Sequence, residues 1–356
     1  MTYKDRIGRE IDRWIEAGLV QSDRRAPMLD MIADPRRLDA ATALAWVGSV
    51  LLGVALVAFV AANWDALTPI LRFTIIVATF LGFAGAGAWA AYRQRPLLTN
   101  MLMMLAAIAY AAAVGLTAQI FDLPSDTRAA CYGAGLAAYG LALAGRSTGA
   151  AVVALILIGF GDFTEHGWFT GQDRDLPWML FASPLGAYLA LRWGSAPLAH
   201  ISAFAIIYCF TWFAARTEAH ASTFIVLALV LGALAASARW LRAHERQFAA
   251  VFYGWFTLAA LMFFAIGGYL PWFGDTNGGI THRLVWLAAS GALIALGRHD
   301  RHGMTTAVAV LSLIGAIIGT LGDLGLNLMA SAGVFLVSAL AALVGGLALR
   351  ARTKAT

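Results

Sequence analysis

The feature that most constrains this chain is a succession of apolar runs, each about 14 to 23 residues long, separated by short polar segments. A helix needs about 20 apolar residues to cross the roughly 30 Å hydrocarbon core of a membrane. The runs cover residues 41–62, 70–91, 100–119, 129–144, 149–163, 176–193, 197–215, 223–238, 248–270, 284–297, 304–321 and 327–349. We therefore predict an all-α polytopic integral membrane protein with about twelve transmembrane helices, or ten or eleven if the shortest runs do not cross.

The composition agrees with this fold class. Hydrophobic residues make up 60% of the 356 residues and charged residues only 13%, about half of what a soluble domain carries. Both cysteines, Cys131 and Cys209, fall inside apolar runs. This placement favours two small packed side chains over a disulfide or a metal pair.

The placement of charge predicts the orientation. If the N-terminus is cytoplasmic, 20 of the 25 Lys and Arg residues lie in cytoplasmic segments, as the positive-inside rule requires. The five on the outer side are Arg72, Arg128, Arg174, Arg216 and Arg283, and ten of the 20 acids join them there. Both termini are thus expected to be cytoplasmic. The net charge of +5 reflects this topology and does not indicate a nucleic-acid partner.

Three parts of the chain are expected. Residues 1–39 are densely charged, and Ile7, Ile11, Trp14 and Ile15 recur at helical spacing before Gly18. We predict a short cytoplasmic amphipathic helical hairpin there, able to pack on the membrane surface or to dock a protein partner. Residues 40–193 and 194–356 would form two six-helix membrane halves, the second with a short basic tail.

Two motifs resemble a known family. The "AANWD" at Ala61–Asp65 follows a charged hairpin with "WIEAGLV", and "GLTAQIFDLPSD" spans Gly115 to Asp126. This pattern, up to about residue 190, resembles bacterial membrane proteins catalogued as domain of unknown function 2157. The resemblance implies a multi-pass protein of the bacterial inner membrane, and it implies no activity.

The Asn63-Trp64-Asp65 motif ends the first apolar run just before Pro69. An interfacial turn accounts for these residue types, because Asn and Asp cap backbone groups and Trp lies well among headgroups. The alternative is that Asp65 lines a polar site that faces outward.

The predicted outer helix ends repeat an acidic pattern. Six such ends carry Asp or Glu218, which would fit two six-helix halves in parallel orientation, as many transporters have. Acidic turns alone would produce the same pattern. If the outer ends do form a site, its candidate substrate-binding residues are Asn63, Trp64, Asp65, Gln119, Asp122, Asp162, Asp275 and Asp323.

Polar groups at membrane depth need a partner or water. Gln119 could bond across helices, and Asp122 could pair with Arg128 or Arg72. Asp162, Glu165 and His166 are weak metal candidates, because one short acidic loop lacks the spaced ligand pairs that metal sites use. The histidines at 220, 244, 282, 299 and 302 are all expected in loops.

Three functions from different classes remain open. The helix count and acidic outer face favour a small-solute transporter or permease. A non-catalytic scaffold or regulator that docks a partner through the N-terminal hairpin fits the poor catalytic inventory. An outer-face enzyme acting on a lipid-linked substrate is the third. No catalytic residues, cofactor or nucleic-acid partner are predicted, whereas lipid contact is expected and a homo-oligomer is compatible with the sequence.

Overall fold

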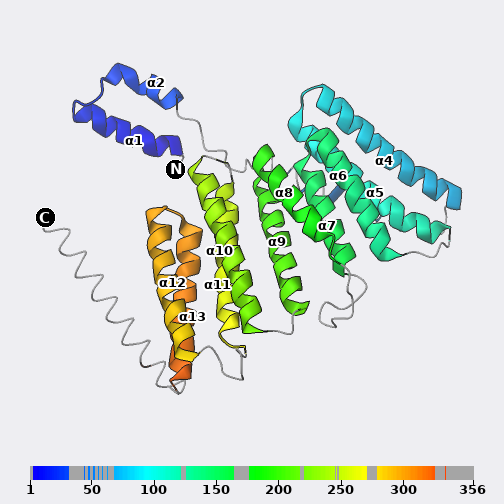
Figure 1. Cartoon of the computed structure of the whole chain (residues 1–356). Coiled ribbons are helices and arrows are strands. Elements are labelled where there is room, and N and C mark those ends of the chain that lie inside the picture. Colours follow the sequence, from blue (N-terminus) through cyan, green and yellow to red (C-terminus); the bar gives the residue numbers. More distant parts are fainter. Residues whose placement is uncertain are drawn as a thin grey trace. The chain divides into compact units, whose positions relative to one another are not determined.

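The computed structural model describes residues 3–31, 68–121, 126–163, 176–216, 220–244, 248–270 and 279–324, with isolated positions elsewhere. Regular structure in these ranges is helical throughout, with twelve α-helices and one short 3-10 helix (Figure 1). The chain divides into two compact units, Met1–Ala66 and Leu67–Thr356. Each unit is described by itself.

The first unit contains a helical hairpin. Helix α1 (Tyr3–Glu16) is followed by a turn at Gly18, where φ is +71°, and then by η1 (Ser22–Arg24) and α2 (Arg25–Asp30). The Arg25 guanidinium donates to both carboxylate oxygens of Asp12, at 2.6 and 3.0 Å, which joins the two helices. This hydrogen-bonded ion pair lowers the pKa of Asp12. The predicted helices within 1–39 are present as far as residue 31, and residues 32–39 lie outside the described ranges.

Ten helices form the described part of the second unit. They are α4 (Pro69–Tyr92), α5 (Pro96–Ile120), α6 (Thr127–Gly145), α7 (Thr148–Phe163), α8 (Met179–Trp193), α9 (Ala196–Arg216), α10 (Ala221–Ala243), α11 (Ala249–Gly267), α12 (Gly279–His299) and α13 (Gly303–Asp323). They coincide with ten of the twelve predicted runs. The first and last runs lie outside the described residues, apart from isolated positions.

Several of these helices suit a bilayer. Seven of the described helices, α4, α5 and α9 to α13, are long and apolar enough to cross a membrane, and α7 is apolar but shorter. The all-α, multi-helix membrane class is therefore confirmed. Exactly twelve crossings and two parallel halves stay predictions.

Consecutive helices pack as hairpins: α4 on α5, α6 on α7, α8 on α9, α10 on α11 and α12 on α13 (Figure 1). We call the ends joined by these five turns the inner ends. The opposite ends, joined by the connections α5–α6, α7–α8, α9–α10 and α11–α12, are the outer ends. The two names follow the orientation predicted from charge.

Small residues bring the helices together. A Cβ on Gly135 would lie 2.6 Å from Ile158, and one on Gly161 would lie 2.5 Å from Tyr132. Buried alanines line the same α6–α7 contact. Close approach through small side chains is typical of membrane helix packing.

One boundary prediction is wrong. Helix α12 begins at Gly279, five residues before the predicted run, so that His282 and Arg283 are buried helical residues instead of loop residues. Their polarity concealed the helix start, although a polar side chain is tolerated there when it finds a partner within the bundle.

Candidate functional site

The structure describes three of the eight candidate substrate-binding residues, namely Gln119, Asp162 and Asp323. The other five, Asn63, Trp64, Asp65, Asp122 and Asp275, lie outside the described residues, as do Glu165 and His166 of the weak metal candidates. In the described part of the chain no group of three His, Cys, Asp or Glu residues could hold a metal ion.

Asp162 joins three helices at their outer ends. Its Oδ1 accepts the Tyr132 hydroxyl at 2.6 Å and the Trp178 backbone N–H at 2.9 Å, and Oδ2 accepts the Met179 N–H at 3.0 Å. The two N–H groups belong to the start of α8, where a carboxylate satisfies orphan donors and favours the helix dipole. Asp162, expected in an exposed acidic loop, is instead a partly buried helix cap.

Tyr132 extends this contact on α6. Its ring stacks on Trp178 with centroids 4.9 Å apart, and its hydroxyl oxygen accepts from the Nε of Arg128 at 3.0 Å. Among the described residues, the Asp162 carboxylate thus accepts hydrogen bonds from three neutral donors, and Tyr132 connects it to the Arg128 guanidinium.

Gln119 lies in a cavity of about 430 Å³ between the outer parts of α5, α6 and α7. Its polar lining comes from Gln119, Thr127 and Cys131, among Gly115, Ala118 and Leu157 and other small apolar residues. Within the described residues the Gln119 amide makes no hydrogen bond, and its side chain is exposed. The Gln119 amide in this cavity is thus available to hydrogen-bond a bound small molecule.

Asp323 pairs with a buried cation. The Arg283 side chain is only 3% exposed, and its Nε donates to Asp323 Oδ2 at 2.8 Å. The guanidinium also lies 3.9 Å from the ring centroid of Tyr269. Among the described groups, Arg283 Nη1 is buried without a hydrogen-bond acceptor.

Arg283 was predicted to lie in an outer loop, and its buried position was not predicted. The signal that could have found it is spacing: Arg283, Trp286 and Ser290 recur at intervals of three and four residues. Trp286 and Ser290 both contact Ser312 on α13, at 2.8 and 3.0 Å. This stripe marks the face of α12 that packs on α13.

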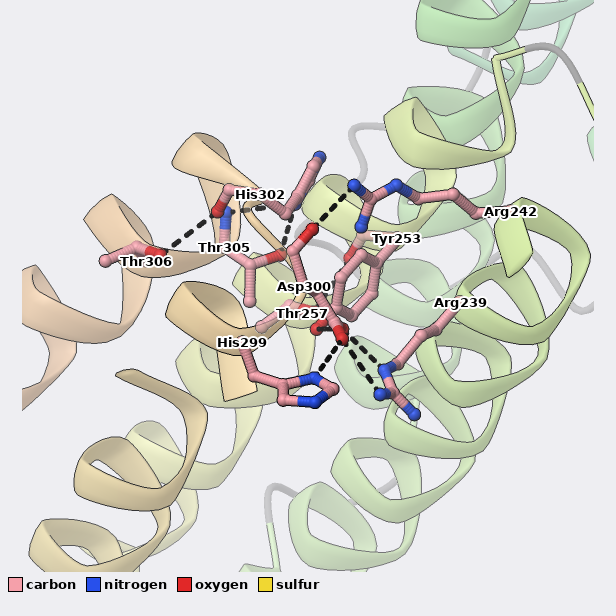
Figure 2. Close-up of polar contacts among 9 residues, drawn as sticks. All are labelled: Arg239, Arg242, Tyr253, Thr257, His299, Asp300, His302, Thr305 and Thr306. Atoms are coloured by element: carbon pink, nitrogen blue, oxygen red, sulfur yellow. Dashed lines mark hydrogen bonds and ion pairs between the residues drawn. The ribbon is translucent and has the colours of Figure 1, made fainter. Parts of the chain in front are cut away.

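A cluster of polar contacts lies at the inner ends of α10 to α13 (Figure 2). Asp300, in the turn between α12 and α13, has a side chain only 9% exposed. The Arg239 guanidinium donates to both of its carboxylate oxygens through Nε and Nη2. Arg242 Nη2 donates to the Asp300 main-chain oxygen at 2.7 Å. These contacts join the α10–α11 hairpin to the α12–α13 hairpin.

Tyr253 and His302 complete this inner cluster. The Tyr253 hydroxyl donates to Asp300 Oδ2 at 3.3 Å, and its ring stacks on His302 with centroids 5.0 Å apart. His302 Nδ1 accepts the Thr305 N–H at 3.3 Å and so caps α13. Figure 2 shows Asp300 joined to both Arg239 and Arg242 of α10.

The two turn residues differ in the origin of their pKa shifts. The hydrogen bond from Arg239 holds the pKa of Asp300 well below its usual range. Burial lowers the pKa of His302 below 6.5, so that the neutral imidazole needed to accept from Thr305 is favoured. The sequence offered only a weak signal here: Arg239, Arg242 and Asp300 lie in neighbouring inner turns.

The structure does not bring the described candidates into one site. Asp162 has its contacts on α6 and α8, and Asp323 pairs with α12, whereas the Gln119 cavity lies among α5, α6 and α7. Asp162 accepts three hydrogen bonds and Asp323 pairs with Arg283, whereas the Gln119 amide lines a cavity and makes no hydrogen bond within the described residues. The Gln119 cavity is therefore taken as the centre of the candidate site.

The family described as "Predicted membrane protein (DUF2157)" matches residues 12–151. The predicted resemblance to this family is confirmed over that part of the chain. No curated protein and no solved structure matches the chain.

Proposed function

We propose that this chain, which the DUF2157 family of predicted membrane proteins matches over residues 12–151, is a permease-like protein for a small solute. The observation that carries the proposal is the Gln119 cavity at the outer ends of α5, α6 and α7. At about 430 Å³, it has the size typical of small-molecule sites, which combine apolar walls with a few polar groups.

The proposed solute is neutral and able to form hydrogen bonds. The Gln119 amide can donate and accept, and the Thr127 hydroxyl lines the same cavity. Among the described residues, no charged side chain lines it. The nearby carboxylate of Asp162 is occupied by three donors. A charged solute would enter an apolar cavity without a counter-ion, which is costly.

The proposed topology is twelve crossings of a bacterial inner membrane with both termini cytoplasmic. Its support is the alternation of ten described helices with short inner turns rich in arginine. Two parallel six-helix halves, 40–193 and 194–356, would give the repeat found in many transporters. Asp65, Asp122 and Asp275 remain proposed members of the outer polar face.

Native Cys131 provides a test, because it lines the cavity, whereas Cys209 is buried elsewhere. In a Cys209→Ala protein held in right-side-out vesicles, an impermeant maleimide should label Cys131. Gln119→Trp should fill the cavity and slow labelling by about tenfold or more. Leu136→Trp, on an exposed position of α6 outside the cavity lining, should not.

Two results would overturn the proposal: no labelling of the native cavity, or equal labelling of the Gln119→Trp and Leu136→Trp proteins. Labelling after denaturation in detergent would establish that Cys131 is present and unmodified in each variant.

A scaffold function is the second candidate, supported by the N-terminal hairpin. Trp14, Leu19 and Met31 are exposed on a unit that the Asp12–Arg25 ion pair holds together. If this face docks a partner, backbone hydrogen exchange across residues 3–31 should be slower in native membranes than in purified protein reconstituted in the same lipids. Equal exchange would argue against docking.

A further inference from the structure

A second cavity, of about 410 Å³, lies between the hairpins α8–α9 and α10–α11. Its walls are mostly apolar, from Leu180 in the first turn of the short helix α8 to Leu191, Leu241 and Phe252 near the inner ends. Ser183 and Ser237 also line it, and the Ser237 hydroxyl donates to the Ala233 carbonyl. We call this cavity the apolar groove.

The length of the apolar groove matches one leaflet of a bilayer. Leu180 and Leu191 are eleven residues apart on α8, a rise of about 16 Å at 1.5 Å per residue. Half of a 30 Å hydrocarbon core is about 15 Å. An extended acyl chain could therefore lie along the groove, with the headgroup of its lipid at the inner ends of the helices.

Two basic residues lie close in sequence to the residues that line the inner end of the apolar groove. Arg192 directly follows Leu191, and Arg246 lies three residues before Ala249, which also lines the groove. Both arginines are exposed and make no ion pair within the described residues. They differ in this from Arg239 and Arg242, whose guanidinium groups bind Asp300.

We propose that the apolar groove binds one acyl chain of an anionic phospholipid, whose headgroup phosphate contacts Arg192 and Arg246. Guanidinium groups bind phosphate through charge-assisted hydrogen bonds. Basic side chains at the inner surface attract anionic lipids. With the predicted orientation, the lipid belongs to the cytoplasmic leaflet. The site is separate from the Gln119 cavity and does not depend on transport.

The experiment measures lipid retention on the full-length protein. The protein is purified in an uncharged maltoside detergent and titrated with phosphatidylglycerol or phosphatidylcholine, and bound lipids are counted by native mass spectrometry. We expect one phosphatidylglycerol molecule to stay bound per protein chain. Phosphatidylcholine with the same acyl chains should be displaced at a lower detergent concentration.

Two variants test the two ends of the proposed contact. Arg192→Gln combined with Arg246→Gln should weaken phosphatidylglycerol binding by about tenfold and reduce its preference over phosphatidylcholine. Ser237→Phe should fill the apolar groove and weaken both lipids. The matched control is Arg298→Gln with Arg301→Gln, two exposed arginines at the inner turn of another hairpin, which should change nothing.

Three outcomes would overturn the proposal. One is equal loss of binding in the control pair, which would indicate general attraction to the basic surface. Another is unchanged binding in both groove variants. The third is a change in oligomeric state with Ser237→Phe and no change in lipid count, which would make a second copy the occupant. Circular dichroism of each variant verifies that its helices are retained.

Discussion

Asp162 and Asp300 are both carboxylates with low exposure, but their partners differ in kind. Asp162 accepts from a tyrosine hydroxyl and two backbone N–H groups, whereas Asp300 accepts from the Arg239 guanidinium in addition to the Tyr253 hydroxyl. Asp162 joins α6, α7 and α8 at their outer ends. Asp300 joins two hairpins at the inner ends.

The comparison shows how the same residue type can carry different energetic roles. When a carboxylate bound by neutral donors is removed, those donors lose their acceptor, and two of the three bonds to Asp162 are partly buried. A partly buried donor without an acceptor costs free energy. A carboxylate paired with an arginine that is 40% exposed leaves a cation that water can solvate. Asp162 should therefore contribute more to stability, although Asp300 has the stronger charge contact.

The largest effect is expected at Asp162. Asp162→Ala removes three hydrogen bonds and should lower the free energy of unfolding by about 2–4 kcal/mol. Asp126→Ala is the matched control, because Asp126 caps α6 through one exposed bond to Ala129 and should cost about 1 kcal/mol. Denaturant titration in detergent micelles measures both. Equal destabilisation would contradict the role given to Asp162.

The second effect concerns the hairpin that carries Asp300. Gly297→Ala would place a Cβ 2.9 Å from the backbone nitrogen of Thr306, so that α12 and α13 must separate, at a cost of about 1–3 kcal/mol. Gly291→Ala, on the same helix with no neighbour within 4 Å, should be neutral or slightly stabilising. The same titration distinguishes them, and a neutral Gly297→Ala would mean that the hairpin is less tightly packed.

The third effect isolates the ion pair. A double-mutant cycle of Arg239→Gln and Asp300→Asn should give a coupling free energy of about 1 kcal/mol, reduced by the solvent around Arg239. Arg242→Gln with Asp300→Asn is the control, because Arg242 binds the main-chain oxygen and should couple weakly. Strong coupling in the control cycle would show that Arg242 acts on the carboxylate as well.

The smallest effect is a pH dependence. The pKa of His302 is lowered by burial from 6.5, so the unfolded chain binds more protons and stability falls as pH drops below 6.5. The pKa of Asp300 is lowered from 3.8, so its stabilisation is lost only as pH falls below about 4. Between pH 7.5 and 5.5 only His302 of this pair contributes.

His302→Asn tests this assignment, because asparagine can still cap α13 but does not titrate. The variant should lose part of the decline in unfolding midpoint between pH 7.5 and 5.5, while Asp300→Asn should retain it. An unchanged decline in His302→Asn would assign the pH dependence to another group.

Much of the fold could be predicted from the sequence. Apolar runs predict membrane helices because the backbone N–H and C=O groups within a bilayer must hydrogen-bond to one another. The ten described helices of the second unit lie where those runs lie. The start of α12 was missed because His282 and Arg283 interrupt the apolar run. Their partners, Phe264 and Asp323, are 18 and 40 residues away in the chain.

The sites were less predictable for the same reason. Gln119 was identified because an amide at membrane depth needs a hydrogen-bond partner. That prediction needs only the residue and the apolar run that contains it. The link between Asp300 and Arg239 spans 61 residues, and it depends on how two hairpins pack. Hydropathy along a single chain contains no information on that packing.

The most direct test of the permease account is the accessibility of position 119 from each side of the membrane. Gln119→Cys is made in a Cys131→Ala, Cys209→Ala background and labelled with an impermeant maleimide in right-side-out and inside-out vesicles. The account predicts labelling from both sides, since a permease must expose its site alternately. Labelling from the outer side alone would contradict it and leave a fixed outer pocket.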